Sequence, residues 1–297
     1  MQKIKSGDKV AIISPCAQIG SMQKISAAVK YLENLGLIPV FGENLLRSNR
    51  YLAGSDEQRA DDINSAFANP EIKAIFCSRA AAGGSRVLPY IDYELARYNP
   101  KPLIGFCDNV ALMLALFFKS GIISYNGFGL TYDFRTDLPL DLQIDADLQN
   151  LLSGKIYNIK SGKPLRHGTV QGTLLCANLS VLMRLAGTPY FPDLNGKILL
   201  LEDVHEKVYR IDLMLQQLKQ QPHFNLLKGV IFGQFTDSES DVEDGNIEDC
   251  FADFIHNTEF PVLTNFNFGH TPSRRVLPLG AKVRLNTAET QLEILNY

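Results

Sequence analysis

The sequence predicts an α/β protein, with an N-terminal doubly wound parallel sheet domain and a smaller C-terminal mixed α/β domain. Short apolar runs typical of strands alternate with stretches whose apolar residues recur at helical spacing, which is the pattern of repeated βαβ units. This pattern weakens over residues 136–167 and then resumes. We therefore expect one domain over residues 1–150, a linker over 151–168 and a second domain over 169–297.

The first domain should contain parallel strands connected by helices. We expect the strands at VAIIS, IPVFG, IKAIFCS and LIGF. Helices are predicted over residues 21–35, from Ser55, from about Ser85 and after Asp108. Ser55 followed three residues later by Gln58 is the signature of a capping box. Because ligands bind at the carboxyl ends of parallel strands, the residues just past these strands should face one crevice, namely Pro15, Arg79 and Cys107.

The second domain repeats the alternation with more strands. Helices are expected through NLSVLMRLAG and from Tyr209 to Gln220, and strands at GTVQGTLL, KILLLEDV, GVIFGQF, PVLTNF and within AKVRLNTAETQLEIL. The acidic stretch DSESDVEDGNIED should be a solvated loop that leads into a short helix, since the ligand spacing of an EF-hand is absent.

Composition excludes several classes of function. The chain has 297 residues with a net charge of −3 and no block of like charges, so we expect no nucleic-acid partner. The first apolar run is too short for a signal peptide or membrane span, which predicts a cytoplasmic protein without a membrane partner. Five widely spaced cysteines without a CxxC pair indicate neither disulfides nor a metal site, and we expect no cofactor.

Cys107 is the leading candidate nucleophile. An apolar run ends at Gly105 and helical periodicity begins after Asp108, so Cys107 lies at a strand-to-helix turn. The free N–H groups and positive dipole end of the helix would favour the thiolate there. The alternative is a small buried hydrophobe, since free cysteines are often buried.

A nucleophilic cysteine needs a base and a group that orients the base. His270 follows the strand PVLTNF, in a loop that would carry it into a crevice, and His205 is its main competitor. Glu202 ends an apolar strand, where a carboxylate usually has a specific partner, although a salt bridge or a helix cap would also explain it. The remaining histidines have polar neighbours and look like surface residues: His167, His223 and His256.

Several strings resemble the LD-carboxypeptidases that trim muropeptides, together with their microcin-immunity relatives. They include GDKVAIISP, KPLIGFCDNVAL, KILLLEDVHEKVYRIDLMLQQL, GVIFGQF and FGHTPSRRVLPLGAKVRL. The resemblance implies a two-domain enzyme, commonly a homodimer without a metal, that has a Ser-His-Glu triad between its domains. The glutamate falls on Glu202, the histidine on His270 and the serine on Cys107, with the family's following aspartate retained as Asp108.

The chain departs from the family pattern around this expected site. The family's RGGYG is Arg79, Ala80, Ala81, Ala82 and Gly83 here, its GGN is Cys176, Ala177 and Asn178, and its GP pair is Gly127 and Phe128. Alanine disfavours the positive φ and the close backbone approach that glycine permits. These differences indicate a changed pocket on a retained scaffold.

Two classes of function remain open from the sequence. The first is a carboxypeptidase that removes the C-terminal D-amino acid from cytoplasmic muropeptides in peptidoglycan recycling, with Cys107, His270 and Glu202 meeting at the interdomain cleft. Oxyanion and substrate binding would then involve Asp108, Ala81 and Arg79. Arg79 would bind a carboxylate of the substrate through its guanidinium donors, unless an internal ion pair already occupies it. The second is a catalytically silent protein that binds a peptide-like ligand. Within the enzyme class, an amidase acting on aminoacyl-nucleotide-type substrates is the variant.

Overall fold

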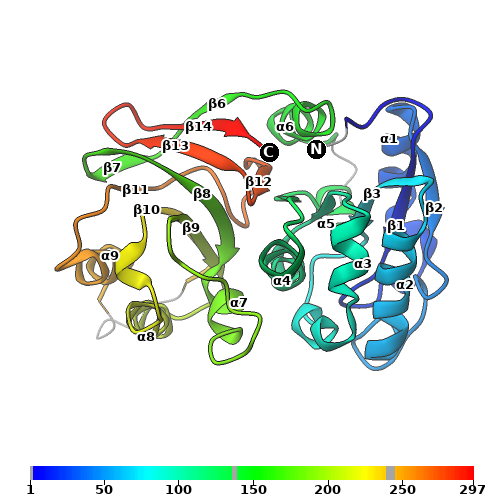
Figure 1. The fold of residues 1–297 in the computed structure, drawn as a ribbon, viewed down its shortest axis with the longest axis horizontal. Helices are drawn as coiled ribbons and strands as arrows, with labels where there is room; N and C mark the ends of the chain where they lie inside the picture. Colours follow the sequence, from blue (N-terminus) through cyan, green and yellow to red (C-terminus); the bar gives the residue numbers. More distant parts are fainter. Residues whose placement is uncertain (1–2, 136–138, 239–244) are drawn as a thin grey trace. The chain divides into compact units, whose positions relative to one another are not determined.

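The computed structural model describes residues 3–135, 139–238 and 245–297, and its chain divides into two compact units. The first unit contains residues 1–156, Arg275–Gly280 and Tyr297, and the second contains Tyr157–Arg274 and Ala281–Asn296. Each unit is built around its own sheet (Figure 1). The two-domain α/β fold class that the sequence predicts is confirmed, and both sheets are mixed.

The sheet of the first unit has the strand order β12-β5-β4-β3-β1-β2. Strands β1 to β5 are parallel and β12 pairs antiparallel with β5. The strands are β1 (Lys9–Ile13), β2 (Ile38–Phe41), β3 (Ile72–Cys77), β4 (Leu103–Gly105), β5 (Ser124–Asn126) and β12 (Leu277–Leu279). The parallel part is therefore a doubly wound sheet whose carboxyl strand ends share one edge.

The helices of this unit include those expected over residues 21–35, from Ser55 and after Asp108, one that begins later than expected, and a last two that the sequence does not predict. They are α1 (Ser26–Asn34), α2 (Asp56–Ala68), α3 (Tyr93–Tyr98), α4 (Val110–Ser120), α5 (Leu130–Asp133) and α6 (Leu142–Leu152). The capping box of Ser55 and Gln58 opens α2 as predicted. A helix does not begin near Ser85: two 3₁₀ turns (Gly84–Arg86 and Leu88–Tyr90) precede α3, whose N-cap Asp92 accepts a hydrogen bond from Leu95 N.

The sheet of the second unit has the order β6-β14-β13-β8-β9-β10-β11-β7. Its centre, β8 to β11, is parallel and its flanks are antiparallel. The strands are β6 (Asn158–Lys160), β7 (Lys163–Arg166), β8 (Thr169–Asn178), β9 (Lys197–Val204), β10 (Gly229–Thr236), β11 (Val262–Thr264), β13 (Lys282–Asn286) and β14 (Gln291–Asn296).

Three helices cross between the parallel strands of the second unit: α7 (Leu179–Arg184), α8 (Val208–Lys219) and α9 (Ile247–Ile255). Phe251 of α9 stacks on Phe232 of β10 with ring centroids 3.8 Å apart, so this helix packs firmly on the sheet. Part of the acidic loop before α9, residues 239–244, lies outside the described residues.

Candidate active site

Cys107 lies on the strand-to-helix turn that the sequence predicts. Strand β4 ends at Gly105, Phe106 is extended, and Cys107 begins a 3₁₀ turn that leads into α4. Cys107 has a φ of 57°, in the left-handed region that non-glycine residues rarely occupy. Strained backbone of this kind gathers at functional sites, and a sharp strand-to-helix turn is how many hydrolases present a nucleophile.

Exposure distinguishes Cys107 from the other cysteines. Its side chain is partly exposed, whereas the other four are buried: Cys16, Cys77, Cys176 and Cys250. Burial raises the pKa of Cys16 and of Cys77, and it raises the pKa of Cys250 to about 11. The interpretation of Cys107 as an inert, buried hydrophobe therefore fits it less well than it fits the other four.

Asp108 fixes the loop that follows β3. Its carboxylate is almost fully buried, and Oδ2 accepts hydrogen bonds from Gly83 N at 2.8 Å and Gly84 N at 2.6 Å. A Cβ atom at Gly84 would lie 2.4 Å from the Asp108 carbonyl oxygen, so this approach requires glycine. The carboxylate therefore joins the loop of residues 79–84 to the turn that carries Cys107.

Two further buried side chains hold the same region, and the sequence analysis missed both. Asn109 donates from Nδ2 to the carbonyl oxygens of Arg79 and Phe106, and its Oδ1 accepts a hydrogen bond from Cys16 Sγ. Arg59 of α2 donates to the carbonyl oxygens of Pro15 and Gly83. Both side chains are buried, so these bonds are sheltered from water.

The alanines of the loop adopt ordinary backbone conformations. Gly83 has a φ of 129°, whereas Ala80, Ala81 and Ala82 all have negative φ. Ala80 and Ala81 are half-buried and Ala82 is exposed. The loop therefore needs positive φ only at Gly83, where the sequence retains glycine, and alanine at 80 and 81 causes no backbone strain there.

Arg79 lies just past the end of β3, and Cys107 lies just past the end of β4, at the same edge of the sheet. Its guanidinium donates a hydrogen bond to the Gln18 carbonyl oxygen, and no ion pair of Arg79 is recorded within the described ranges. The two carboxylates considered as internal partners are engaged with backbone N–H groups, Asp108 with the loop and Asp92 with the start of α3. The carboxylate-binding role of Arg79 stays a prediction.

In the second unit, Glu202 and His270 form a buried hydrogen-bonded pair. Glu202 Oε2 lies 2.8 Å from His270 Nδ1, and their side chains are 1 % and 9 % exposed. Glu202 stands on the central strand β9, opposite Asn178 of β8. Its second oxygen, Oε1, has no hydrogen-bond partner among the described residues. The carboxylate therefore hydrogen-bonds the imidazole of His270, and it does not cap helix α8, which was the alternative considered from the sequence.

A bulge in β10 brings His270 to this carboxylate. The register of β10 against β9 shifts between Phe232 and Phe235. There Gln234 N donates to the Phe268 carbonyl oxygen at 2.8 Å, which holds the loop after β11 against the strand. A Cβ atom at Gly233 would come within 2.4 Å of that oxygen, so the close approach depends on glycine.

His205 and Asp203 have other roles than the pair. His205 is 76 % exposed and its Nδ1 lies 3.9 Å from Asp237, so the competing histidine does not contact Glu202. Asp203 is buried, and its carboxylate accepts hydrogen bonds from Ser180 N and Oγ at the start of α7. Burial, reinforced by the charge of Glu202, raises the pKa of Asp203 to about 6.

The structure thus places the predicted site residues in two groups. Arg79, Ala81, Cys107 and Asp108 belong to the first unit, and Glu202 and His270 belong to the second. Within the described ranges, no group of three His, Cys, Asp or Glu side chains is arranged to hold a metal ion. Within the same ranges, no helix is both long and apolar enough to cross a membrane.

A thiol on a strained strand-to-helix turn and a buried carboxylate–imidazole pair are the parts of a hydrolase that works by nucleophilic catalysis. Comparison with known proteins identifies the family to which this chain belongs. Residues 10–127 match the family model of the LD-carboxypeptidase N-terminal domain, and residues 171–285 match that of the LD-carboxypeptidase C-terminal domain. The chain belongs to the LD-carboxypeptidase family.

Individual relatives agree with this assignment. The probable murein peptide carboxypeptidase of Bacillus subtilis is 31 % identical over 291 residues, which cover 96 % of this chain and 91 % of the relative. The crystal structure of muramoyltetrapeptide carboxypeptidase from Oxalobacter formigenes is similar with a TM-score of 0.88 at 27 % identity, over 97 % and 99 % of the two chains. The microcin C7 self-immunity protein MccF in complex with aspartyl sulfamoyl adenosine shares the fold, with a TM-score of 0.88 at 22 % identity over 100 % and 99 %.

Proposed function

We propose that this chain is a cysteine-dependent LD-carboxypeptidase that removes the C-terminal D-amino acid from a muropeptide. The observation that carries the proposal is the buried hydrogen bond between Glu202 and His270. Burying a carboxylate with one oxygen unpartnered costs free energy, and an apolar side chain would suit the centre of β9 better. Orienting a catalytic imidazole is a reason for that carboxylate to be there.

In the proposed reaction, His270 Nε2 takes the Cys107 thiol proton before substrate binds, and the Sγ thiolate of the resulting thiolate–imidazolium pair attacks the carbonyl carbon of the last peptide bond. Glu202 holds the Nδ1–H tautomer and stabilises the imidazolium that forms. Backbone N–H groups near Cys107 and Asp108, with that of Ala81, stabilise the oxyanion. His270 then protonates the leaving amine, the D-amino acid departs, and the acyl group remains on sulfur as a thioester.

Hydrolysis of the thioester completes the cycle. His270 takes a proton from water, the hydroxide attacks the acyl carbon, and the proton returns to the departing thiolate as the shortened peptide leaves. No redox step occurs, and the three side chains return to their starting states. A cytoplasmic, homodimeric enzyme of peptidoglycan recycling is part of the same proposal.

The direct test is release of D-alanine from a tetrapeptide that ends in D-alanine. Wild type should cleave this peptide and leave the diastereomer ending in L-alanine intact. Cys107→Ala and His270→Ala should each lower kcat/KM by about 10³-fold or more. His205→Ala is the matched control, because it removes an exposed histidine of the same unit, and it should retain wild-type activity.

The remaining outcomes discriminate between the alternatives. If wild type binds the tetrapeptide but releases no D-alanine, the chain is a binding protein and the catalytic proposal is wrong. If it instead hydrolyses an aminoacyl-nucleotide amide, the substrate resembles the aspartyl sulfamoyl adenosine of the MccF complex, and the muropeptide assignment fails while the triad stands.

A further inference from the structure

The chain returns from the second unit to the first at Arg275, five positions after His270. Five extended residues span at most about 18 Å, and a folded segment spans less. Arg274 Nη1 donates a hydrogen bond to the carbonyl oxygen of Thr271 at 3.1 Å, so the segment between these two residues is folded into a turn. The place where the first unit holds Arg275 therefore limits where the imidazole can lie.

A buried ion pair holds Arg275 in the first unit. Asp147 of α6 accepts two hydrogen bonds from the guanidinium, from Nε to Oδ2 and from Nη2 to Oδ1, each at 2.7 Å. The same carboxylate accepts a third hydrogen bond from Val276 N at 3.1 Å. The side chain of Asp147 is 1 % exposed and that of Arg275 is 12 % exposed. Because two parallel bonds fix the plane of the guanidinium and the third fixes the backbone beside it, the pair sets the position and the direction of the returning chain.

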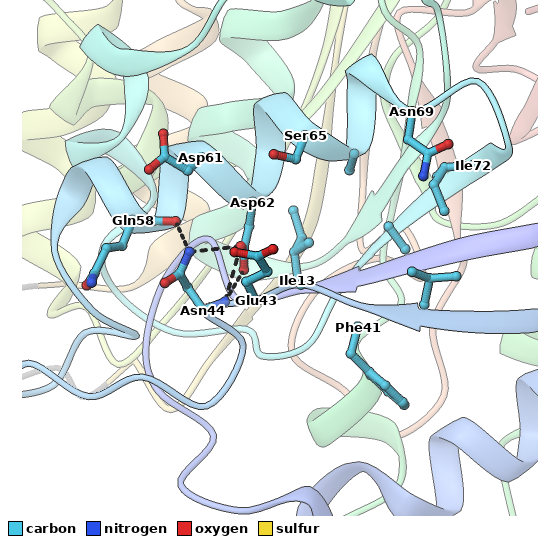
Figure 2. A pocket seen from close by; sticks show the side chains of 14 residues that line it. Ile13, Phe41, Glu43, Asn44, Gln58, Asp61, Asp62, Ser65, Asn69 and Ile72 are labelled. Atoms are coloured by element: carbon cyan, nitrogen blue, oxygen red, sulfur yellow. Dashed lines mark hydrogen bonds between the residues drawn. The ribbon is translucent and has the colours of Figure 1, made fainter.

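Asp147 contrasts with Asp62, another buried carboxylate of the first unit. Figure 2 shows Asp62 of α2 accepting hydrogen bonds from Asn44, which holds the chain just past β2 against its own neighbour. Asp147 instead bonds an arginine 128 positions away in the sequence. Burial raises the pKa of Asp147, against the hydrogen bonds from Arg275. The other buried residues of α6 are all apolar, and an apolar side chain would avoid this cost, so the ion pair calls for a reason other than stability.

The returning segment joins the sheet beside the strand that leads to Cys107. Strand β12 pairs with β5, and β5 pairs with β4. Neighbouring strands lie about 4.8 Å apart, so β12 runs about 10 Å from β4. Gly127 N donates to the carbonyl oxygen of Gly105, the last residue of β4, at 3.0 Å, and a Cβ atom at Gly127 would lie 2.5 Å from the Arg275 carbonyl oxygen. One glycine thus separates the backbone of Arg275 from the end of the strand that presents the thiol.

We propose that the ion pair between Asp147 and Arg275 positions His270 for its proton transfer with Cys107. The pair fixes the chain at Arg275, and the turn closed by Arg274 carries this constraint back to the imidazole. Asp147 and Arg275 are positioning residues, because they act through the backbone of the loop and not on the substrate. This role rests on the proposed function, since it concerns the same cysteine–histidine pair.

The most informative variant removes both charges at once. In the double variant Asp147→Asn, Arg275→Met, no buried charge is left unpaired, asparagine still accepts a hydrogen bond from Val276 N, and methionine keeps an apolar stem, so we expect it to fold. Without the two parallel bonds the imidazole should be misplaced. We expect kcat for D-alanine release from the tetrapeptide to fall about 10- to 100-fold and KM to stay within about threefold. Arg275→Lys keeps the charge without the planar pair of donors and should lower kcat about three- to tenfold.

The pH profile of Cys107 alkylation distinguishes a misplaced imidazole from a general loss of stability. A thiolate paired with an imidazolium should react with iodoacetamide at a rate that changes little between about pH 7 and 5.5, and this is the profile expected of wild type. In the double variant the rate should approach a tenfold fall for each pH unit. Tyr125→Phe is the matched control, because it removes a buried hydrogen bond of 3.1 Å from Tyr125 Oη to the Leu151 carbonyl oxygen of the same helix without touching Arg275. It should keep the wild-type kcat and profile.

Wild type tests the proposed function, and the comparison of variants with wild type tests the positioning role. A folded double variant with wild-type kcat and a flat profile would overturn the positioning role and leave the triad intact. An equal loss in Tyr125→Phe would also overturn it, because loosening of α6 would then be the cause. If wild type releases no D-alanine, the proposed function fails and the alkylation profiles decide: a flat profile that steepens in the double variant supports the positioning role, and a profile already steep in wild type overturns it. If the double variant does not fold, unchanged kcat and profile in Arg275→Lys overturn the role.

Discussion

Selective alkylation of Cys107 tests the nucleophile without requiring a substrate. Cys250 offers an internal reference, because its pKa is about 11. If Cys107 had an ordinary thiol pKa of about 8.5, its thiolate fraction at pH 7 would exceed that of Cys250 about 300-fold. The more basic thiolate reacts faster by about 10- to 20-fold over this range, which leaves a preference of about 20-fold for Cys107. Burial of Cys250 adds to this preference.

The pH profile distinguishes a thiol paired with His270 from an ordinary one. Alkylation of an unpaired thiol slows tenfold for each pH unit below its pKa. A thiolate stabilised by an imidazolium is already ionised, so the rate at Cys107 should change little between pH 7 and 5.5. In His270→Ala the profile should return to the tenfold dependence. His205→Ala should leave the profile unchanged.

Iodoacetamide labelling followed by mass mapping measures these rates at each cysteine. A steep pH dependence at Cys107 in wild type, unchanged by His270→Ala, would show that the two side chains do not act together. Labelling of Cys107 no faster than that of Cys250 would refute the interpretation of the strand-to-helix turn as an activating environment.

Three further predictions follow from individual contacts. Arg79→Ala should raise KM for a peptide with a free C-terminus and change it little for the amidated peptide, whereas equal losses on both in a steady-state assay would exclude carboxylate binding. Asp108→Ala should leave two buried N–H groups unsatisfied and lower the free energy of unfolding by about 2–5 kcal/mol in urea titrations; a loss under 1 kcal/mol would contradict the anchoring role. The pKa of Asp203 is raised in the fold, so its contribution to stability is full below about pH 4 and is lost as pH rises through about 6. Relative to wild type, Asp203→Asn should therefore gain about 2 kcal/mol in the free energy of unfolding between pH 4 and 7, and parallel pH curves of Tm would contradict this.

Periodicity located the elements that carry the site, because each of those elements has a strong local signal. The apolar strand before Cys107 and the helix after it are both confirmed, and so is the strand that ends near Glu202. The pairing of Glu202 with His270 could not come from periodicity. It depends on the bulge at Gly233, which shifts the register by residues that carry no distinctive pattern.

The roles of Arg59 and Asn109, which hold the loops of the first unit, could not be predicted from the sequence for a different reason. Arg59 falls within an amphipathic helix, where an arginine is normally solvated, and Asn109 resembles an ordinary residue of a first helical turn. Each is buried because long-range contacts satisfy its donors. The predicted helix near Ser85 failed because Pro89 and the cap at Asp92 favour short turns before α3.

Residues that match the family pattern near Cys107 and residues that depart from it differ in whether they fix the path of the loop. Gly83 and Gly84 donate to Asp108, and these three positions fix where the loop lies. Ala80 and Ala81 lie in the same loop, yet with negative φ they do not determine its path. Replacing glycine there adds methyl groups without requiring a different backbone path. The alanines at these two positions are therefore compatible with the loop path that Asp108 fixes through Gly83 and Gly84.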